Sequence, residues 1–292
     1  IAMPIKDEKL ISKKYLYYFL SSLNWDVLAG KDIKVKGKTL NKAKLKELPI
    51  LVPPLAEQQR IVAKLNAAFA EIDEAMNAAE AKETEVQKLK TSLLSSSLNG
   101  DAVMWNTVKL GDMLEVQNGY AFNSKQFDVD GDMPLIRIRD LKNAFKTETC
   151  YTGEYDDKYI VQSGDLLIGM DGEFRCYEWQ GGAALLNQRV CKLQNFHADL
   201  DQRFLLYAIN SELKKIEDVT GFTTVKHLSS NTIKQIELSI PSLAEQQRIV
   251  AKLDAADSEF RNVNESIAKS KANLLALKSA ILIQELKLEK AA

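Results

Sequence analysis

An exact internal repeat constrains this chain more than any other feature of its sequence. Residues 55–65 read LAEQQRIVAKL, and residues 243–253 read the same eleven letters. The offset of 188 residues continues outward without gaps and aligns Pro53 with Pro241. This period is too long for a solenoid, whose repeats span about 20 to 50 residues. It indicates a duplicated unit that consists of a globular domain followed by a helix.

Each copy of the repeat opens a segment with apolar or small residues at alternating steps of four and three. The pattern runs from Ile61 to Leu93 in the first copy and from Ile249 to Leu288 in the second. Sustained heptads with few Gly or Pro predict two long helices with a coiled-coil seam, each about 40 residues or roughly 60 Å long. Because both seams lie in one chain, we expect them to pack together as an antiparallel pair. The alternative is a seam between chains that binds a partner.

The sequence between the two helices has a different pattern. Short β-rich runs at 135–138, 166–168 and 190–193 alternate with turn pairs such as Asn118-Gly119 and Asp171-Gly172. A helix-like stretch near 203–215, a short helix near 229–235 and a final strand to Ile240 follow. The pattern predicts an α+β domain.

The repeat and the patterns together predict four parts. Residues 1–54 form the C-terminal part of a first globular domain, 55–104 the first long helix, 105–242 a complete second domain and 243–292 the second long helix. The 84 residues from 105 to 188 have no counterpart in the first copy, so we expect the front of the first domain to be missing from this sequence. The predicted fold class is α+β, with globular domains joined by two long antiparallel coiled-coil helices and duplicated about a pseudo-twofold axis.

Composition excludes several classes of protein. The chain carries 39 Lys and Arg against 40 Asp and Glu, which argues against binding of nucleic acid by bulk charge. It has no run of 18 apolar residues, so the sequence predicts no membrane span. Three scattered cysteines favour a reduced, cytoplasmic protein. With no phosphate-binding Gly loop, no C-x-x-C and no metal-spaced histidines, we expect no cofactor and no catalytic site.

Several motifs occur in an order that resembles the specificity subunit of type I restriction-modification systems. The first is a Pro followed by Leu-x-Glu-Gln-x-x-Ile at each helix start. The others are Trp105–Asp112, Gly119–Phe122, Gly164–Ile168, Leu186–Arg189 and His227–Ser229. The resemblance covers essentially the whole chain. It implies a non-catalytic subunit in which each target recognition domain reads one half of a split DNA site, here a single half-site because the first domain lacks its front.

The resemblance also implies partners. They are double-stranded DNA, two methyltransferase subunits docked on the family's conserved helices, and restriction-translocase subunits that join this core. The predicted docking residues lie in the two Glu-Gln-Gln-Arg segments: Glu57, Gln58, Arg60, Glu245, Gln246 and Arg248. The alternative is that these residues only cap and register the helices, because acidic and amide side chains suit the first turn.

The predicted DNA contacts are polar and basic residues at strand ends and turns. Residues 105–242 hold 15 basic and 20 acidic residues, so their cations must gather on one face. The candidates are Tyr120, Asn123, Lys125, Arg137, Arg139, Arg175, Thr223, Thr224, Lys226 and His227, with Arg189 as a further cation and Lys34, Lys36 and Lys38 in the first block.

Different roles are predicted within this set. Arg139, Arg175 and residues 223–227 are expected to enter a groove, and Lys125 to contact phosphate. Arg137 and Arg139 should share one face of a strand, since strand side chains alternate. Alternatively, Arg139 pairs with Asp140 or Asp165 and only braces the fold. The lysine run 31–38 could likewise protect an edge strand, and Phe122 is expected in the core.

Two other functions compete with DNA reading. A coiled-coil scaffold would space two protein-binding domains, and it would show no preference among random duplexes. An autonomous methyltransferase would bind S-adenosylmethionine or transfer methyl groups without a partner. The absent motifs argue against the second.

Overall fold

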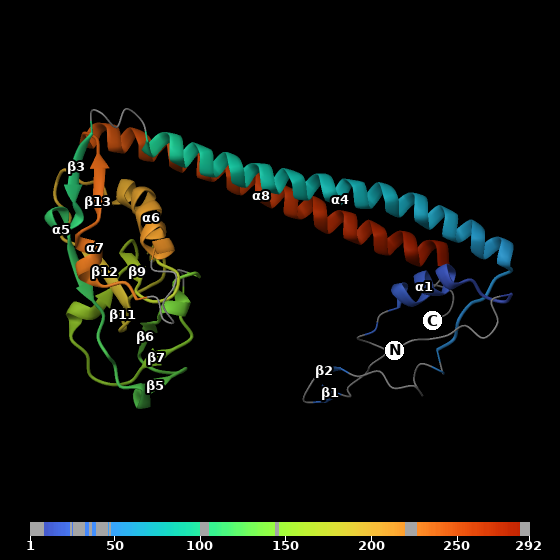
Figure 1. The fold of residues 1–292 in the computed structure, drawn as a ribbon. Coiled ribbons are helices and arrows are strands. Elements are labelled where there is room, and N and C mark those ends of the chain that lie inside the picture. The colour runs from blue at the N-terminus through green and yellow to red at the C-terminus, as the bar shows by residue number, and fades with distance from the viewer. Residues whose placement is uncertain are drawn as a thin grey trace. The chain divides into compact units, whose positions relative to one another are not determined.

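A computed structural model describes residues 9–23, 25, 33–34, 37–38, 46, 48–99, 105–143, 146–219 and 227–286. The chain divides into two compact units (Figure 1). Unit 1 comprises Ile1–Leu89 and Glu259–Ala292, and unit 2 comprises Lys90–Ser258. No helix in the described ranges has the length and apolar character needed to cross a membrane.

The two repeats open the long helices α4 (Leu55–Leu98) and α8 (Leu243–Leu286), each of 44 residues. Within unit 1, three ion pairs join them: Lys64 with Glu285, Asp73 with Lys278, and Glu83 with Lys271. Residue numbers rise along α4 as they fall along α8, so the helices are antiparallel. Within unit 2, Lys90 pairs with Asp257 in the same sense. The predicted packing of the two helices on each other is confirmed.

Unit 1 also contains the short helix α1 (Lys13–Ser22) and the paired strands β1 (Ile33–Lys34) and β2 (Gly37–Lys38). Ser12 caps α1, because its side chain accepts a hydrogen bond from the Tyr15 N–H. Tyr15 and Tyr18 of α1 are buried against Ile61, Leu65 and Phe69 of α4 and against Leu282 and Leu286 of α8. This apolar cluster holds α1 on the helix pair.

Unit 2 is an α+β domain built on two sheets. The four-stranded sheet has the order β10-β9-β12-β4 (Cys176–Glu178, Leu166–Gly169, Val190–Gln194 and Glu115–Asn118). The five-stranded sheet has the order β5-β7-β6-β11-β8 (Phe127–Asp128, Cys150–Tyr151, Met133–Ile136, Ala184–Leu186 and Ile160–Val161). A separate pair joins β13 (Glu237–Ile240) to β3 (Asn106–Lys109).

Three α-helices and three 3₁₀ turns complete the described part of unit 2. The helices are α5 (Leu110–Met113), α6 (Gln202–Val219) and α7 (Ser230–Lys234). The 3₁₀ turns are η2 (Ser124–Gln126), η3 (Ile138–Asp140) and η4 (Asp157–Tyr159). The predicted strands at 166–168 and 190–193, both shorter helices and the final strand to Ile240 are confirmed.

The main core of unit 2 lies between the four-stranded sheet, α6 and the start of α8. Ile168 and Cys191 of the sheet are buried with Phe204 of α6 and with Ile249 and Leu253 of α8. Burial of a large apolar side chain of this kind contributes about 1.5–3 kcal/mol. The recognition of α8 by this core is therefore mainly apolar.

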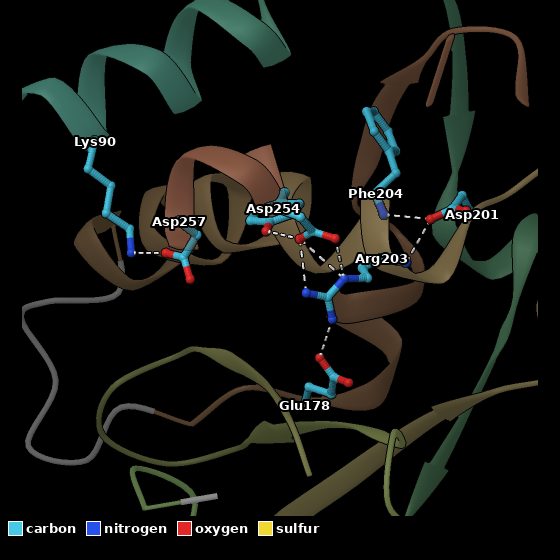
Figure 2. Close-up of polar contacts among 8 residues, drawn as sticks. Lys90, Glu178, Asp201, Arg203, Phe204, Asp254 and Asp257 are labelled. Atoms are coloured by element: carbon cyan, nitrogen blue, oxygen red, sulfur yellow. Dashed lines mark hydrogen bonds and ion pairs between the residues drawn. The ribbon is translucent and has the colours of Figure 1, made fainter. Parts of the chain in front are cut away.

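A polar cluster reinforces the same junction. Figure 2 shows Arg203 of α6 between Asp254 of α8 and Glu178 of β10. The guanidinium donates to Asp254 through Nε and Nη2, each at 2.9 Å, and to Glu178 through Nη1 at 2.8 Å. The Tyr207 hydroxyl also donates to Asp254. The hydrogen bond to Asp254 raises the pKa of Arg203, and burial raises the pKa of Tyr207.

One predicted strand is shorter than its apolar pattern suggests. β6 ends at Ile136, because the Asp140 carboxylate accepts the Arg137 N–H at 2.9 Å and the Asp140 N–H returns to the Arg137 C=O at 2.8 Å. This reciprocal pair closes η3 directly after the strand. The prediction that Arg137 and Arg139 share a strand face is therefore wrong, since Arg139 lies in the 3₁₀ turn.

Candidate nucleic-acid interface

The strand ends of unit 2 bring several predicted site residues to one edge. β4 and β9 end there and β12 begins there, since Asn118 pairs with Cys191 and Gly169 pairs with Val190 in antiparallel register. In the other sheet, β6 and β11 are parallel and reach the same edge, where Ile136 pairs with Leu186. We call this the loop edge and define it as residues 119–120, 137–142, 170–175, 187–189 and 227.

Tyr120 is held at the loop edge by the turn between β11 and β12. Its N–H donates to the Leu186 C=O at 2.9 Å, and its C=O accepts the Gln188 N–H at 2.8 Å. A Cβ on Gly119 would lie 2.1 Å from the Asn187 carbonyl oxygen, so only glycine allows this approach. The Tyr120 ring is 50% exposed and lies 5.1 Å from the ring of Phe122, which is buried as predicted.

Arg139 projects from η3 with its side chain 66% exposed. Its Nε is 3.9 Å from Asp140, whose carboxylate is occupied by the Arg137 N–H and by the Thr147 hydroxyl. Burial raises the pKa of Asp140. Asp165, the other predicted partner, instead accepts the Gln162 N–H. A pair this long contributes little to stability, so Arg139 is available to a ligand.

Arg137 and Arg175 differ in their surroundings. The Arg137 Nε is buried and has no hydrogen-bond partner in the described part of the chain. Arg175 is exposed and stands 5.7 Å from the Tyr177 ring centroid. Its loop is anchored by Phe174, a buried residue whose N–H donates to Glu217. The exposed guanidinium therefore projects from a fixed backbone.

His227 lies beside Asp171, a residue that the sequence patterns marked only as part of a turn. Its Nδ1 is 2.8 Å from Asp171 Oδ1, and Arg189 Nη1 donates to Asp171 Oδ2 at 2.6 Å. Burial by itself would raise the pKa of Asp171, but these two hydrogen bonds hold it below its ordinary value. No sequence motif pointed to this carboxylate, because its three partners come from separate strands and loops.

The structure does not bring every predicted contact to the loop edge. The Asn123 side chain caps η2 by accepting the Lys125 N–H at 3.1 Å. Lys125 lies near the start of β6, at the opposite end of that strand from Arg137, as the pairing of β5, β7 and β6 requires. Thr223, Thr224, Lys226 and Lys36 lie outside the described residues. Of Lys34 and Lys38 only the backbone is described, in β1 and β2.

The predicted docking residues divide into a buried and an exposed set. Gln58 and Gln246 are fully buried. Gln58 donates to the C=O of Leu10 and Pro53 and accepts the Ser12 N–H, each at 2.8 Å. Gln246 makes the same set of three bonds with Asp199, Pro241 and Asp201. Both glutamines therefore register the helix start, as the alternative interpretation expected, and offer no surface to a partner.

Glu57 and Arg60 of α4, and Glu245 and Arg248 of α8, form the exposed set. In each helix the arginine donates two hydrogen bonds to the glutamate three residues earlier, at 2.6–2.8 Å. The hydrogen bond from Arg248 lowers the pKa of Glu245. Each unit thus presents an identical charged pair one turn from the buried glutamine.

No group of three or more His, Cys, Asp or Glu side chains is arranged to hold a metal ion within the ranges that the structure describes. Cys176 and Cys191 are buried in the sheet, and burial raises the pKa of Cys191 to about 12. A thiol with so high a pKa is a poor nucleophile at neutral pH.

The chain resembles known specificity subunits over most of its length. Residues 2–82 and 102–272 match the model of the type I restriction modification DNA specificity domain. The chain is 35% identical over 194 residues to the type I restriction enzyme EcoBI specificity subunit of Escherichia coli, a match that covers 65% of this chain and 41% of that protein. It is 26% identical to a putative specificity subunit of Haemophilus influenzae, over 90% of this chain and 69% of the other.

Solved structures give the same fold. One chain, from work on complex assembly and conformational transition of the type I R-M system, superimposes with a TM-score of 0.78 at 20% identity, over 96% of this chain and 72% of that one. The HsdS subunit from Thermoanaerobacter tengcongensis gives 0.57 at 19% identity, over 96% and 71%. The matched ranges cover both long helices and nearly all of unit 2. The chain belongs to the family of type I restriction-modification DNA specificity domains.

Proposed function

We propose that this chain is the non-catalytic DNA-reading component of a type I restriction-modification complex, and that the loop edge of unit 2 reads one half-site. The loop edge carries this proposal. It gathers donors from five separate segments: the Arg139 and Arg175 guanidinium groups, the Tyr120 ring and hydroxyl, and the side chains of Arg189 and His227.

Charge distribution supports the choice of this edge. The segment 105–242 has five more acidic than basic residues, so bulk attraction to DNA is weak and local cations must position it. The opposite edge of the four-stranded sheet carries Glu115, bonded to Asn195, and Glu178, bonded to Arg203. Its carboxylates are unsuited to a phosphate backbone. The exposed arginines of the loop edge fit one, and they also fit the paired acceptors of guanine.

Selection from random duplexes tests this function. The full chain is purified with the methyltransferase subunits it binds and is mixed with duplexes that carry randomised positions. Enrichment of a defined sequence is expected, and Arg175→Ala should weaken it. A complex that binds DNA but enriches no sequence would support the scaffold function instead.

We further propose that methyltransferase subunits dock on the outer faces of α4 and α8. The two identical Glu–Arg pairs and the two identical sets of glutamine bonds support a duplicated docking surface, as two copies of one partner require. Glu57→Lys and Glu245→Lys, alone and together, should reduce co-purification of the partner, with the larger loss in the double variant. Unchanged co-purification of the double variant would rule these pairs out as the docking surface.

A further inference from the structure

We propose that Arg189 reads a guanine in the half-site, and that Asp171 is a positioning residue that aims the Arg189 guanidinium and the His227 imidazole at neighbouring groups of the groove. The inference rests on the proposed DNA-reading function and adds a residue-level assignment to it. Three observations support it: the backbone of Arg189, the sharing of Asp171, and the donors that remain on Arg189.

The backbone fixes the direction in which Arg189 leaves the turn between β11 and β12. Its φ is 74°, a left-handed conformation that is unfavourable for any residue with a Cβ. The surroundings enforce it, because the Arg189 C=O accepts the Met170 N–H at 2.8 Å, and Met170 in turn accepts the Leu228 N–H at 2.7 Å. The turn, the end of β9 and the segment at His227 are thus tied in one row. Strain maintained in this way is common at functional sites.

Asp171 connects the same three segments through its side chain. One carboxylate oxygen takes the Arg189 Nη1 and the other faces the His227 Nδ1. Asp171 and His227 also form a backbone bridge. The Asp171 side chain is only 22% exposed, whereas those of Arg189 and His227 are 56% and 53% exposed. The carboxylate is therefore inside the cluster, and the two donors are on its outer surface.

The donors left on Arg189 match a base edge. Asp171 engages only Nη1, and in the described part of the chain Nε and Nη2 make no hydrogen bond. These two parallel N–H groups fit the O6 and N7 acceptors of guanine. A phosphate fits less well, because the Asp171 carboxylate at 2.6 Å offsets the charge of Arg189 and repels a second anion. The arrangement thus favours an uncharged acceptor pair over the DNA backbone.

The test compares base preference at every position of the half-site. The full chain, in complex with its methyltransferase subunits, is applied to randomised duplex pools as wild type and as Arg189→Ala, Arg189→Lys and Asp171→Asn. Glu173→Gln is the matched control, since Glu173 is in the same loop and pairs with Lys142 at 2.8 Å. Arg189→Lys keeps the positive charge but loses the two-pronged donor, so it remains informative even if Arg189→Ala folds poorly.

The expected result is a local loss of specificity. Arg189→Ala and Arg189→Lys should each lose a preference for guanine at one base pair by about 5- to 150-fold and leave other positions unchanged. Asp171→Asn should show a smaller loss at that same base pair, which a merely structural role would not produce, and Glu173→Gln none. Arg189 variants that weaken all sequences alike, with a reduced salt dependence, or that leave every preference unchanged, would overturn the inference. If the wild-type complex itself shows no preference, the proposed function fails instead.

Discussion

The starts of α4 and α8 have the same eleven residues, yet the segments packed against them are held differently. In both, a buried glutamine makes three hydrogen bonds to the preceding chain. In unit 1, the Tyr18 hydroxyl donates to the neutral Asn66. In unit 2, Tyr207 donates instead to Asp254, which also takes two bonds from Arg203. A constant apolar and amide core thus carries a variable polar contact.

The strand before each helix also differs. Leu238 and Ile240 of β13 are buried and paired with β3, whereas Ile50 and Val52 are each more than a third exposed. The amide contacts of the helix start therefore do not depend on a paired strand. Variants at equivalent positions can separate what the shared motif contributes from what the neighbouring domain adds.

Removal of the buried glutamines should have the largest effect. Gln246→Ala leaves the Asp201 N–H and the C=O groups of Asp199 and Pro241 without their partner, and Gln58→Ala does the same in unit 1. Each should cost about 2–3 kcal/mol, because unsatisfied buried groups cost about 1–3 kcal/mol each and water reaches some of them. Urea unfolding measures the loss. Loss in one variant only would show that the two starts are not equivalent.

Thiol labelling can assign each loss to a unit. All three cysteines lie in unit 2, with Cys176 and Cys191 buried and Cys150 partly buried. In the wild type, a thiol reagent should modify Cys150 first and the other two only on unfolding. Gln246→Ala should speed their labelling, and Gln58→Ala should leave it unchanged. Equal acceleration by both variants would mean that the units unfold as one.

Exchange of the variable contact should have an intermediate effect. Asp254→Asn gives unit 2 the amide that unit 1 has at Asn66, and it removes the charge that faces Arg203. Because Arg203 is about half exposed, the expected loss is about 1 kcal/mol. The reverse change, Asn66→Asp, adds a carboxylate without an arginine and should destabilise slightly. Thermal unfolding of both variants measures the asymmetry, and identical shifts would contradict it.

The acid side of the stability profile should show a smaller effect. The pKa of Asp171 is below its ordinary value of 3.8 in the folded chain. This carboxylate therefore stabilises the fold above that pH, and the contribution is lost as pH falls below 3.8 through the folded-state pKa. Asp171→Asn should reduce stability at neutral pH and make the decline below pH 3.8 less steep. The check is urea unfolding in a pH series, and parallel curves for the two proteins would disprove the contribution.

The exposed pairs should matter least for folding. Arg60→Ala and Arg248→Ala remove equivalent surface contacts with Glu57 and Glu245, and neither should measurably change the unfolding midpoint. A clear shift in either would show that the pair does more than present charge. The same two variants serve as controls for the glutamine series.

Much of this architecture could be predicted from local pattern. The heptads from Ile61 and Ile249 specified both long helices, because helix periodicity is expressed over many residues. The β-rich runs at 166–168 and 190–193 were predictable for the same reason on a shorter scale. The end of β6 was not, because it depends on one carboxylate, that of Asp140, folding back on the Arg137 N–H.

The candidate site was predictable only in part. Arg139, Arg175 and His227 follow turn signals, and the register of the strands brings them to one edge. Asp171 and Arg189 meet through pairing between strands that are distant in sequence, which local pattern does not encode. The burial of Gln58 and Gln246 also depends on a segment about 45 residues earlier in each case, so a polar residue in a first helical turn was expected at the surface.

Hydrogen exchange with and without DNA tests the central claim, that the loop edge of unit 2 contacts DNA, most directly. The full chain with its methyltransferase subunits is exchanged alone and with a duplex selected by the wild type. DNA should slow exchange in peptides that contain residues 119–120, 137–142, 170–175, 187–189 and 227. It should leave peptides that contain Glu115, Glu178 and Asn195 unchanged. Protection of this opposite edge, with none at the loop edge, would contradict the account.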